Sequence, residues 1–313
     1  MNDTLMSTTS IIKKYRIRSV QRYIHALKGV SLSIQSNTIH GLVGESGCGK
    51  TTLGRIVSGL IKPDEGMVCY QGRALSSIHR KDRNIQYIFQ DPRDSLDPRY
   101  CVQEIIGEGL FGRRVGSQES RLAKIRAILE AVGLHADTLR RSPHQFSGGE
   151  RQRLVIARAL VTQPELVVCD EPVSSLDVSV QAQILNLLLE LKIKHRLSYL
   201  FISHDLHVVR FMADQITVMY LGKVVEEGPA EDVYQKPLHP YTCLLIQSIP
   251  VIGKKLVPLP QRIDAVESIG CAFFPRCPFG QPLCAKEDPP LRRLEGYPDR
   301  STACHFAELL TRS

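Results

Sequence analysis

The chain has 313 residues, of which 43% are hydrophobic and 23% charged, a composition typical of a soluble globular protein that excludes disordered and collagen-like classes. Its net charge of +8 would suit nucleic acid, nucleotide phosphates or an anionic membrane surface, and it singles out none of them. No apolar run approaches the roughly 20 residues that span a bilayer, and the N-terminus lacks the apolar core of a signal peptide, so we expect a cytoplasmic protein.

The first half of the chain predicts strands on either side of a glycine-rich loop. Short strands are expected over residues 26–43, and a helix over residues 50–60 follows the loop. A turn over 63–66 leads into a strand at 67–70. Apolar side chains at a spacing of three and four residues predict an amphipathic helix over 117–132, in a mainly helical middle region.

The second half returns to strands, with a helix between the first two. The predicted strands cover residues 165–169, 199–203, 216–220 and 223–226, and the helix covers residues 181–194. Strands that alternate with helices favour an α/β fold with a mostly parallel sheet. The helical region, about residues 91–163, is then an insertion between the two halves of that sheet.

A change of composition at Pro237 indicates a domain boundary. Prolines recur from there toward the C-terminus and break any long helix, which marks a separate, loop-rich tail. A single core rarely grows far beyond about 250 residues, so the length also favours one large domain and an appendage. We therefore predict one domain over residues 1–236 and a C-terminal extension over residues 237–313.

A phosphate-binding loop is predicted at residues 44–51, which read GESGCGKT and fit the pattern GxxxxGK[ST]. Its glycines let backbone N–H groups turn toward a phosphate, and the following helix adds the positive end of its dipole. Lys50 is expected to neutralise β- and γ-phosphate oxygens, and the Thr51 hydroxyl to ligate Mg²⁺. The residues predicted to bind the nucleotide here are Gly44, Ser46, Gly47, Cys48, Gly49, Lys50, Thr51 and Thr52.

Two adjacent carboxylates, Asp170 and Glu171, end the apolar strand that begins at Leu166. Asp170 is placed to hold Mg²⁺, and Glu171 to act as general base on the water that attacks the γ-phosphate. Without the phosphate loop, the same pair would be interpreted as an acidic turn at the end of a strand. Loop and carboxylates together predict a phosphate-loop NTPase that hydrolyses ATP with Mg²⁺.

Residues 146–153 read FSGGERQR, which resembles the signature sequence of ABC ATPases. In that family the serine and glycines of this motif, here Ser147, Gly148 and Gly149, bind the γ-phosphate held by the opposite subunit. The resemblance therefore implies a dimer with shared ATP sites. The motif also fits an ordinary helix start, with Ser147 as N-cap and Glu150 closing a capping box.

Further landmarks of the ABC ATPases follow in order, and the resemblance covers roughly residues 10–235. Gln90 resembles the residue of the glutamine loop, Asp177 lies in a segment similar to the D-loop, and His204 resembles the switch histidine. The resemblance assigns catalysis to Glu171, His204 and Gln90, nucleotide contact to Asp177, and Mg²⁺ binding to Thr51, Gln90 and Asp170. An aromatic ring near the start of these domains usually stacks on adenine, with Tyr15 as the candidate and Tyr23 as the alternative.

Two stretches resemble the oligopeptide, dipeptide and nickel importer branch of the family: residues 89–99, an extended glutamine-loop text, and residues 239–242, which read HPYT. This resemblance implies a subunit that powers import of peptides, nickel or related small solutes from the cytoplasmic face of the inner membrane. The implied partners are a second ATPase subunit, more often a paralogue than an identical copy, two membrane permeases and an extracytoplasmic solute-binding protein, with no nucleic acid.

Four cysteines in the extension, Cys271, Cys277, Cys284 and Cys304, predict a metal site. Four thiolates can saturate one tetrahedral metal or the irons of a cubane cluster. Members of the importer branch carry a [4Fe–4S] cluster in such an extension, so the resemblance favours the cluster. Zinc, uncoordinated or oxidised thiols, and a ligand role for His305 stay open as alternatives.

Two rival functions fit part of the pattern. A soluble ABC ATPase that acts on nucleic acid or ribosomes would suit the basic charge, but such proteins usually carry two cassettes or a long coiled-coil insertion, whereas this chain has one phosphate loop. An iron–sulfur regulatory or assembly ATPase would suit the cysteines, but that family lacks the importer-type tail. Both rank below the transporter subunit.

Overall fold

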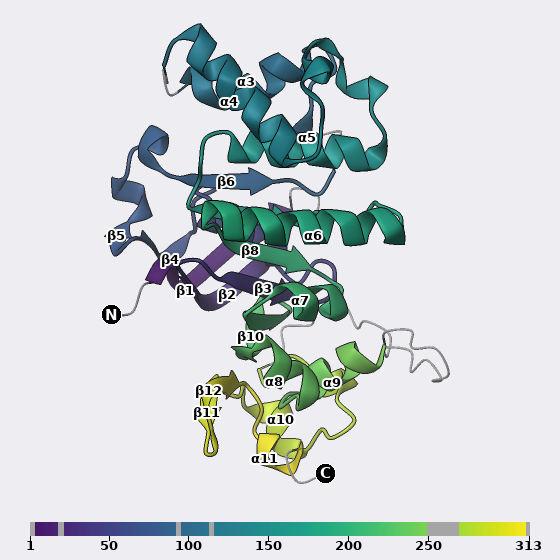
Figure 1. The fold of residues 1–313 in the computed structure, drawn as a ribbon. Coiled ribbons are helices and arrows are strands. Elements are labelled where there is room, and N and C mark those ends of the chain that lie inside the picture. Colours follow the sequence, from purple (N-terminus) through teal and green to yellow (C-terminus); the bar gives the residue numbers. More distant parts are fainter. Residues whose placement is uncertain (1–3, 18–21, 92–94, 113–115, 249–268, 311–313) are drawn as a thin grey trace.

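The computed structural model describes residues 4–17, 22–91, 95–112, 116–248 and 269–310, which form two sheets surrounded by helices (Figure 1). The larger sheet contains, in spatial order, β11 (Arg292–Leu294), β12 (Tyr297–Thr302), β10 (Lys223–Pro229), β9 (Gln215–Tyr220), β3 (Ile39–Val43), β8 (Ser198–Ser203), β7 (Leu166–Asp170) and β6 (Ile85–Ile88). The smaller, antiparallel sheet contains β2 (Arg22–Gln35), β1 (Thr4–Ile17), β4 (Glu65–Tyr70) and β5 (Arg73–Ala74).

The strands from β9 to β6 pair in parallel and form the centre of the fold. Helices cover both faces of these strands, so successive side chains of β8 enter different cores. Tyr199 and Phe201 pack in the core that includes α6 (Val178–His195) and α7 (Leu206–Met212). Leu200 and Ile202 pack in the core that includes α1 (Lys50–Val57). The predicted α/β fold with a mostly parallel sheet is confirmed for these strands.

The smaller sheet forms a separate layer against α1. Leu27 and Ile34 of β2 share one hydrophobic core with Leu53 and Ile56 of α1. The sequence predicted part of β2 and β4 but neither β1 nor the division into two sheets. Alternation of apolar residues identifies a strand, but it does not identify the strand's partner.

The described residues between β6 and β7 are mainly helical, as the sequence predicted. This region contains α3 (Val102–Gly112), α4 (Gln118–Ala131) and α5 (Gly148–Leu160), and α5 contacts both β6 and α6.

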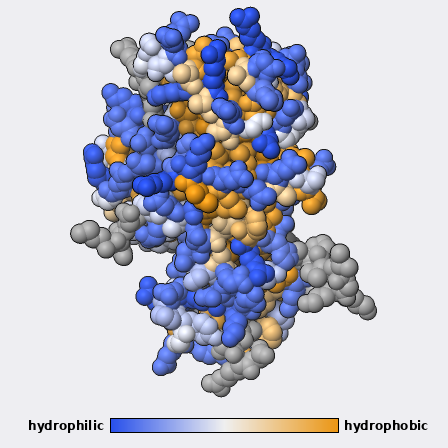
Figure 2. Space-filling view, in the orientation of Figure 1, coloured by the Kyte–Doolittle hydropathy of each residue, from blue (hydrophilic) through white to orange (hydrophobic). Residues whose placement is uncertain are grey.

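In the view of Figure 2, apolar residues gather over the upper part of the molecule, while the face of the extension is mostly hydrophilic. Neither these helices nor any others in the described ranges are long and apolar enough to cross a bilayer.

The described part of the C-terminal extension continues the larger sheet. β12 pairs antiparallel with β10, with Thr302 opposite Glu226. The extension's helices, all short, are α9 (Pro240–Gln247), α10 (Pro282–Lys286) and α11 (Ala307–Leu310), after α8 (Ala230–Gln235) of the preceding domain. The pairing holds the extension against the core, whereas the boundary at residue 236 stays a prediction.

A buried ion pair fastens the extension to β10. Arg300 of β12 donates to the Glu226 carboxylate at 2.6 Å, and both side chains are almost wholly buried. The same carboxylate accepts the N–H groups of Leu238 (2.8 Å) and His239 (3.0 Å). Burial raises the pKa of Glu226, and these hydrogen bonds and Arg300 oppose that rise.

We expect Arg300→Met to lower the free energy of unfolding by about 3–5 kcal/mol, because it leaves the Glu226 carboxylate buried without its countercharge. Urea titration followed by circular dichroism measures this change. Arg293→Met, at an exposed position on the neighbouring strand β11, is the control and should change stability by less than about 0.5 kcal/mol. Equal stability of the two variants would contradict a fastening role for the buried pair.

Candidate active site

The phosphate loop lies between β3 and α1, and its backbone requires glycine. Gly49, at the N-cap of α1, has φ 109°, and a Cβ there would lie 2.4 Å from the Ala26 carbonyl oxygen. Gly44 is equally constrained, since a Cβ would lie 2.2 Å from the Met219 carbonyl oxygen. Glycine at these positions lets the loop pack closely against β2 and β9.

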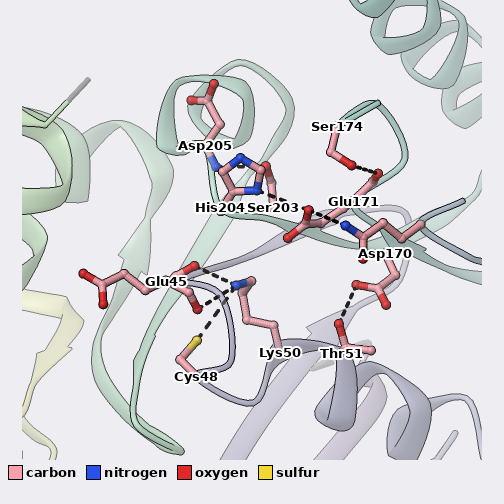
Figure 3. Close-up of polar contacts among 12 residues, drawn as sticks. Glu45, Cys48, Lys50, Thr51, Asp170, Glu171, Ser174, Ser203, His204 and Asp205 are labelled. Carbon is pink, nitrogen blue, oxygen red and sulfur yellow. Dashed lines mark hydrogen bonds and ion pairs between the residues drawn. The ribbon is translucent and has the colours of Figure 1, made fainter. Parts of the chain in front are cut away.

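Lys50 lies inside this loop and is buried. Its Nζ donates to the carbonyl oxygens of Gly44 (2.7 Å) and Glu45 (3.1 Å) and lies 4.0 Å from the Cys48 sulfur (Figure 3). Burial raises the pKa of the Cys48 thiol, which stays neutral beside the ammonium. The loop thus holds one cation at its centre, where a phosphate oxygen would be neutralised.

Asp170, at the end of β7, is buried and held by two hydroxyl groups. Thr51 Oγ1 donates to Asp170 Oδ1 at 3.1 Å, and the Tyr87 hydroxyl donates to Oδ2 at 2.7 Å. Burial raises the pKa of Asp170, while the two hydrogen bonds oppose that rise. A carboxylate beside a threonine hydroxyl offers the oxygen ligands that Mg²⁺ prefers. Sequence reasoning missed Tyr87, because its place beside Asp170 depends on the pairing of β6 with β7.

Glu171 follows Asp170 with a left-handed backbone, φ 47°. Its Oε2 accepts from Gln90 Nε2 at 3.1 Å and lies 3.2 Å from His204 Nδ1 (Figure 3). The hydrogen bond from His204 is the main cause that lowers the pKa of Glu171, and the same bond raises the pKa of His204. The three predicted catalytic side chains therefore meet, with the carboxylate held in its ionised form.

A cavity of about 780 Å³, a size that suits a nucleotide, lies beside Lys50 and Glu171, whereas Asp170 and His204 do not line it. Predicted residues that line it are Tyr15, Ser46, Gly47, Gly49, Lys50, Thr51, Thr52, Gln90 and Glu171. Tyr15 pairs with Ile24, which also lines the cavity, so the adjacent Tyr23 points to the other face of the sheet. Tyr15 therefore lines the cavity, and Tyr23 does not.

The remaining predicted residues lie on separate, exposed helix starts. Ser147 caps α5, with its Oγ accepting from the Glu150 N–H (3.3 Å) and the Glu150 carboxylate accepting from the Ser147 N–H (2.8 Å). This capping box was predicted. Asp177 is the N-cap of α6 and is exposed, next to Val178, whose side chain is 83% exposed. None of Ser147, Gly148, Gly149 and Asp177 lines the cavity described above. Residues 92–94, which belong to the extended glutamine-loop motif predicted at residues 89–99, lie outside the described residues.

The four cysteines of the extension line one cavity of about 220 Å³, together with His305 and several aromatic rings. Burial is the main cause that raises the pKa of Cys271 and Cys277, and it raises the pKa of Cys304 to about 11, while the neighbouring thiols add to each rise. His305 Nε2 forms a 3.0 Å hydrogen bond with the Glu287 carbonyl. Within the described ranges, no three His, Cys, Asp or Glu side chains form a group that could hold a metal ion.

Two side chains of the extension also reach the phosphate loop, and sequence reasoning missed both. The Tyr241 hydroxyl accepts the Glu45 N–H at 2.8 Å. Arg276 donates to both carboxylate oxygens of Glu45, at 2.8 and 3.0 Å. Tyr241 belongs to the HPYT stretch, so its place in that motif was a signal, whereas Arg276 carried none.

Comparison with known proteins decides the family. A model of the ABC transporter family matches residues 27–174, and a model of the C-terminal region of oligopeptide/dipeptide transporters matches residues 225–284. The chain is 42% identical to the oligopeptide transport ATP-binding protein AppF of Bacillus subtilis, over 97% of this chain and 98% of that protein. The chain belongs to the ABC transporter family. It is also 38% identical to the di/tripeptide transport ATP-binding protein DppF of Pseudomonas aeruginosa, over 98% of each chain.

A solved ABC structure is similar to the main body of this ABC ATPase. An ATP-binding cassette solved as a dimer in a post-hydrolysis state, bound to ADP and Pi, has a TM-score of 0.64 and 29% sequence identity. The match covers 72% of this chain and 98% of the cassette. The predicted ABC ATPase fold and the predicted ATP-hydrolysing activity are therefore confirmed.

Proposed function

We propose that this ABC ATPase powers the import of peptides through separate membrane permeases, from the cytoplasmic face of the inner membrane. The match to the C-terminal region of oligopeptide/dipeptide transporters supports this cargo, as do relatives whose names specify oligopeptide and di/tripeptide transport. The same relatives disfavour a role on nucleic acid or ribosomes, despite the net charge of +8. Nickel or another small solute is the alternative cargo.

The observation that carries the ATPase mechanism is Glu171 held between Gln90 and His204, at the wall of the cavity that Lys50 also lines. Lys50 neutralises phosphate oxygens, and Glu171 takes the proton of the attacking water. Mg²⁺, when bound, neutralises charge on the β- and γ-phosphate oxygens. Thr51, Asp170 and Gln90 are the residues that would hold it, and the oxygen donors present fit that ion. His204 fixes the Glu171 carboxylate by their hydrogen bond.

A second ATPase subunit completes the site in this proposal. Ser147, Gly148, Gly149 and Asp177 lie at exposed helix starts away from this chain's own cavity, which fits contact with a nucleotide held by a partner. We propose that the partner is a paralogue and that two permeases and an extracytoplasmic solute-binding protein complete the importer. We propose that residues 1–236 form the domain that carries the ATP site and that residues 237–313 form the extension, whose strand β12 pairs with β10.

Uptake by the assembled importer tests the proposed cargo. The chain is purified together with its permeases, and the complex is inserted into lipid vesicles. ATP is supplied on the side of the membrane that carries the ATPase. The solute-binding protein and a labelled pentapeptide or labelled nickel are added on the opposite side. Accumulation of peptide that stops when ATP is omitted is the expected result. Accumulation of nickel alone would overturn the peptide assignment, and a complex without permeases would overturn the transporter role.

We also propose a [4Fe–4S] cluster on Cys271, Cys277, Cys284 and Cys304. The support is that all four line one cavity, among the rings of Phe273, Phe274, Phe279 and Phe306. Four thiols that line one apolar cavity match the number of sulfur ligands of a cubane, in which each cysteine binds a different iron. Zinc and uncoordinated thiols remain the alternatives that the experiment distinguishes.

Anaerobic purification with iron, sulfide and zinc analysis tests the cluster. We expect about four irons and four sulfides per chain in the wild type and a large loss in Cys277→Ser. Cys243→Ser is the matched control, because Cys243 lies close to the other thiols but does not line their cavity, and it should keep the iron. One zinc per chain, or no metal, would withdraw the cluster and leave the ATPase assignment standing.

A further inference from the structure

Arg276 connects the cysteine-bearing extension to the phosphate loop through a paired hydrogen bond. Its Nη1 and Nη2 donate to the two carboxylate oxygens of Glu45, at 3.0 and 2.8 Å. The Arg276 side chain is 3% exposed and that of Glu45 18%. Two parallel hydrogen bonds in such a buried environment fix the orientation of the Arg276 guanidinium and its distance from the Glu45 carboxylate. Solvent screens the charges of this pair little.

Aromatic rings surround this ion pair and hold it at one position. The Arg276 guanidinium lies 5.7 Å from the ring centre of Tyr220 and 5.8 Å from that of Phe273. Its Nη1 also donates to the Tyr220 hydroxyl at 3.3 Å. Tyr241 packs on both rings and accepts the Glu45 N–H, so the extension holds Glu45 at its backbone as well as at its side chain.

The position of Arg276 depends on the loop that carries the cysteines. Arg276 ends the short 3-10 turn Phe274–Arg276 and is followed directly by Cys277. The loop is closed at its start by the Cys271 N–H, which donates to the Cys284 carbonyl at 2.8 Å. A change in the arrangement of these cysteines therefore moves Arg276, whose guanidinium binds the Glu45 carboxylate.

Glu45 in turn contacts Lys50, the residue assigned above to neutralise phosphate oxygens. Its side chain points away from Lys50, while its carbonyl oxygen accepts from Lys50 Nζ at 3.1 Å (Figure 3). Without Arg276, the Glu45 carboxylate would be an unpaired anion beside a loop that binds a polyphosphate. Repulsion between these charges, and freedom of the Glu45 backbone, would both weaken the binding of ATP.

We propose that Arg276 is a positioning residue of the ATP site, which makes the affinity for ATP depend on the fold of the cysteine-bearing loop. The proposal rests on the phosphate-loop assignment made above. It places no requirement on which metal the cysteines hold. Arg276 acts through Glu45 and touches neither nucleotide nor reacting atoms.

Calorimetric titration of the full chain with ATP tests the proposal. Arg276→Met should raise the dissociation constant about tenfold, because one charge-assisted pair is lost and an anion is exposed to the phosphates. Arg276→Lys should recover part of the affinity, since an ammonium neutralises Glu45 without the two-pronged geometry. Adding Glu45→Gln to Arg276→Met should restore the affinity to within about threefold of the wild type, because the unpaired charge is removed.

Arg300→Met is the matched control, because it breaks another buried ion pair between the extension and the core without touching the phosphate loop. It should lower the unfolding temperature and leave the dissociation constant for ATP unchanged. An equal rise in both arginine variants would overturn the proposal and reduce Arg276 to a stability contact. So would wild-type affinity in Arg276→Met, or the absence of rescue by Glu45→Gln.

Cys277→Ser tests the dependence on the cysteine-bearing loop. Cys277→Ser should raise the dissociation constant for ATP. Combining it with Arg276→Met should raise that constant little further, because both changes disrupt the same ion pair between Arg276 and Glu45. Additive effects, or no effect of Cys277→Ser, would overturn this dependence. Lys50→Ala separates failure of the phosphate-loop assignment from failure of this proposal. If Lys50→Ala still binds ATP, the phosphate-loop assignment fails. If Lys50→Ala loses ATP binding while Arg276→Met binds ATP like the wild type, only the proposal for Arg276 is rejected.

Discussion

Glu171→Gln is expected to reduce ATP turnover by about 10²–10⁴-fold while ATP still binds. The amide keeps the size of the side chain and can still hydrogen-bond to Gln90 and His204, but it cannot take a proton from water. ATP should then persist in the closed pair of subunits. Phosphate release measures the turnover, and size-exclusion chromatography with ATP detects the trapped dimer.

Glu165→Gln is the control for this result. Glu165 precedes β7 and Glu171 follows it, so the same chemical change is made at opposite ends of one strand. Glu165 accepts from the Tyr70 hydroxyl at 2.7 Å, far from the cavity, and its variant should turn over ATP at the wild-type rate. Normal turnover in Glu171→Gln would contradict the assignment of Glu171 as the base.

Lys50→Ala is expected to weaken ATP binding by about a hundredfold, because the loop loses its buried cation and the charge-assisted hydrogen bonds to phosphate oxygens. The two carbonyl groups that Lys50 now contacts, those of Gly44 and Glu45, would also lose their donor. Calorimetric titration with ATP measures the change, and circular dichroism checks that α1 still folds.

Lys192→Ala is the matched control, because Lys192 forms a partly exposed ion pair with Asp214 at 3.4 Å and does not line the ATP cavity. Its removal should leave ATP affinity within about twofold of the wild type and change stability little. If both lysine variants bound ATP alike, the interpretation of residues 44–51 as a phosphate loop would have to be abandoned.

Local chemistry made the main part of this site predictable from the sequence. A strand, a glycine-rich turn and a helix within residues 39–57 form Lys50's surroundings, and each of these elements depends on neighbours in the chain. Asp170 and Glu171 were equally accessible, because they end a wholly apolar strand. For Gln90 and His204 the sequence offered only a resemblance, and their convergence on Glu171 required the parallel order of β6, β7 and β8.

The sequence by itself determined β3, β7, β8 and β9, the helices α1 and α6, the phosphate loop and the acidic pair, because side-chain periodicity and backbone requirements act over a few residues. It did not predict β6. Only the tertiary structure decided that the smaller sheet is a layer of its own, that β12 extends the larger sheet beside β10, and that Arg276 forms an ion pair with Glu45. These contacts join residues far apart in the chain. They depend on the packing of whole elements, which leaves no local pattern in the residues that make them.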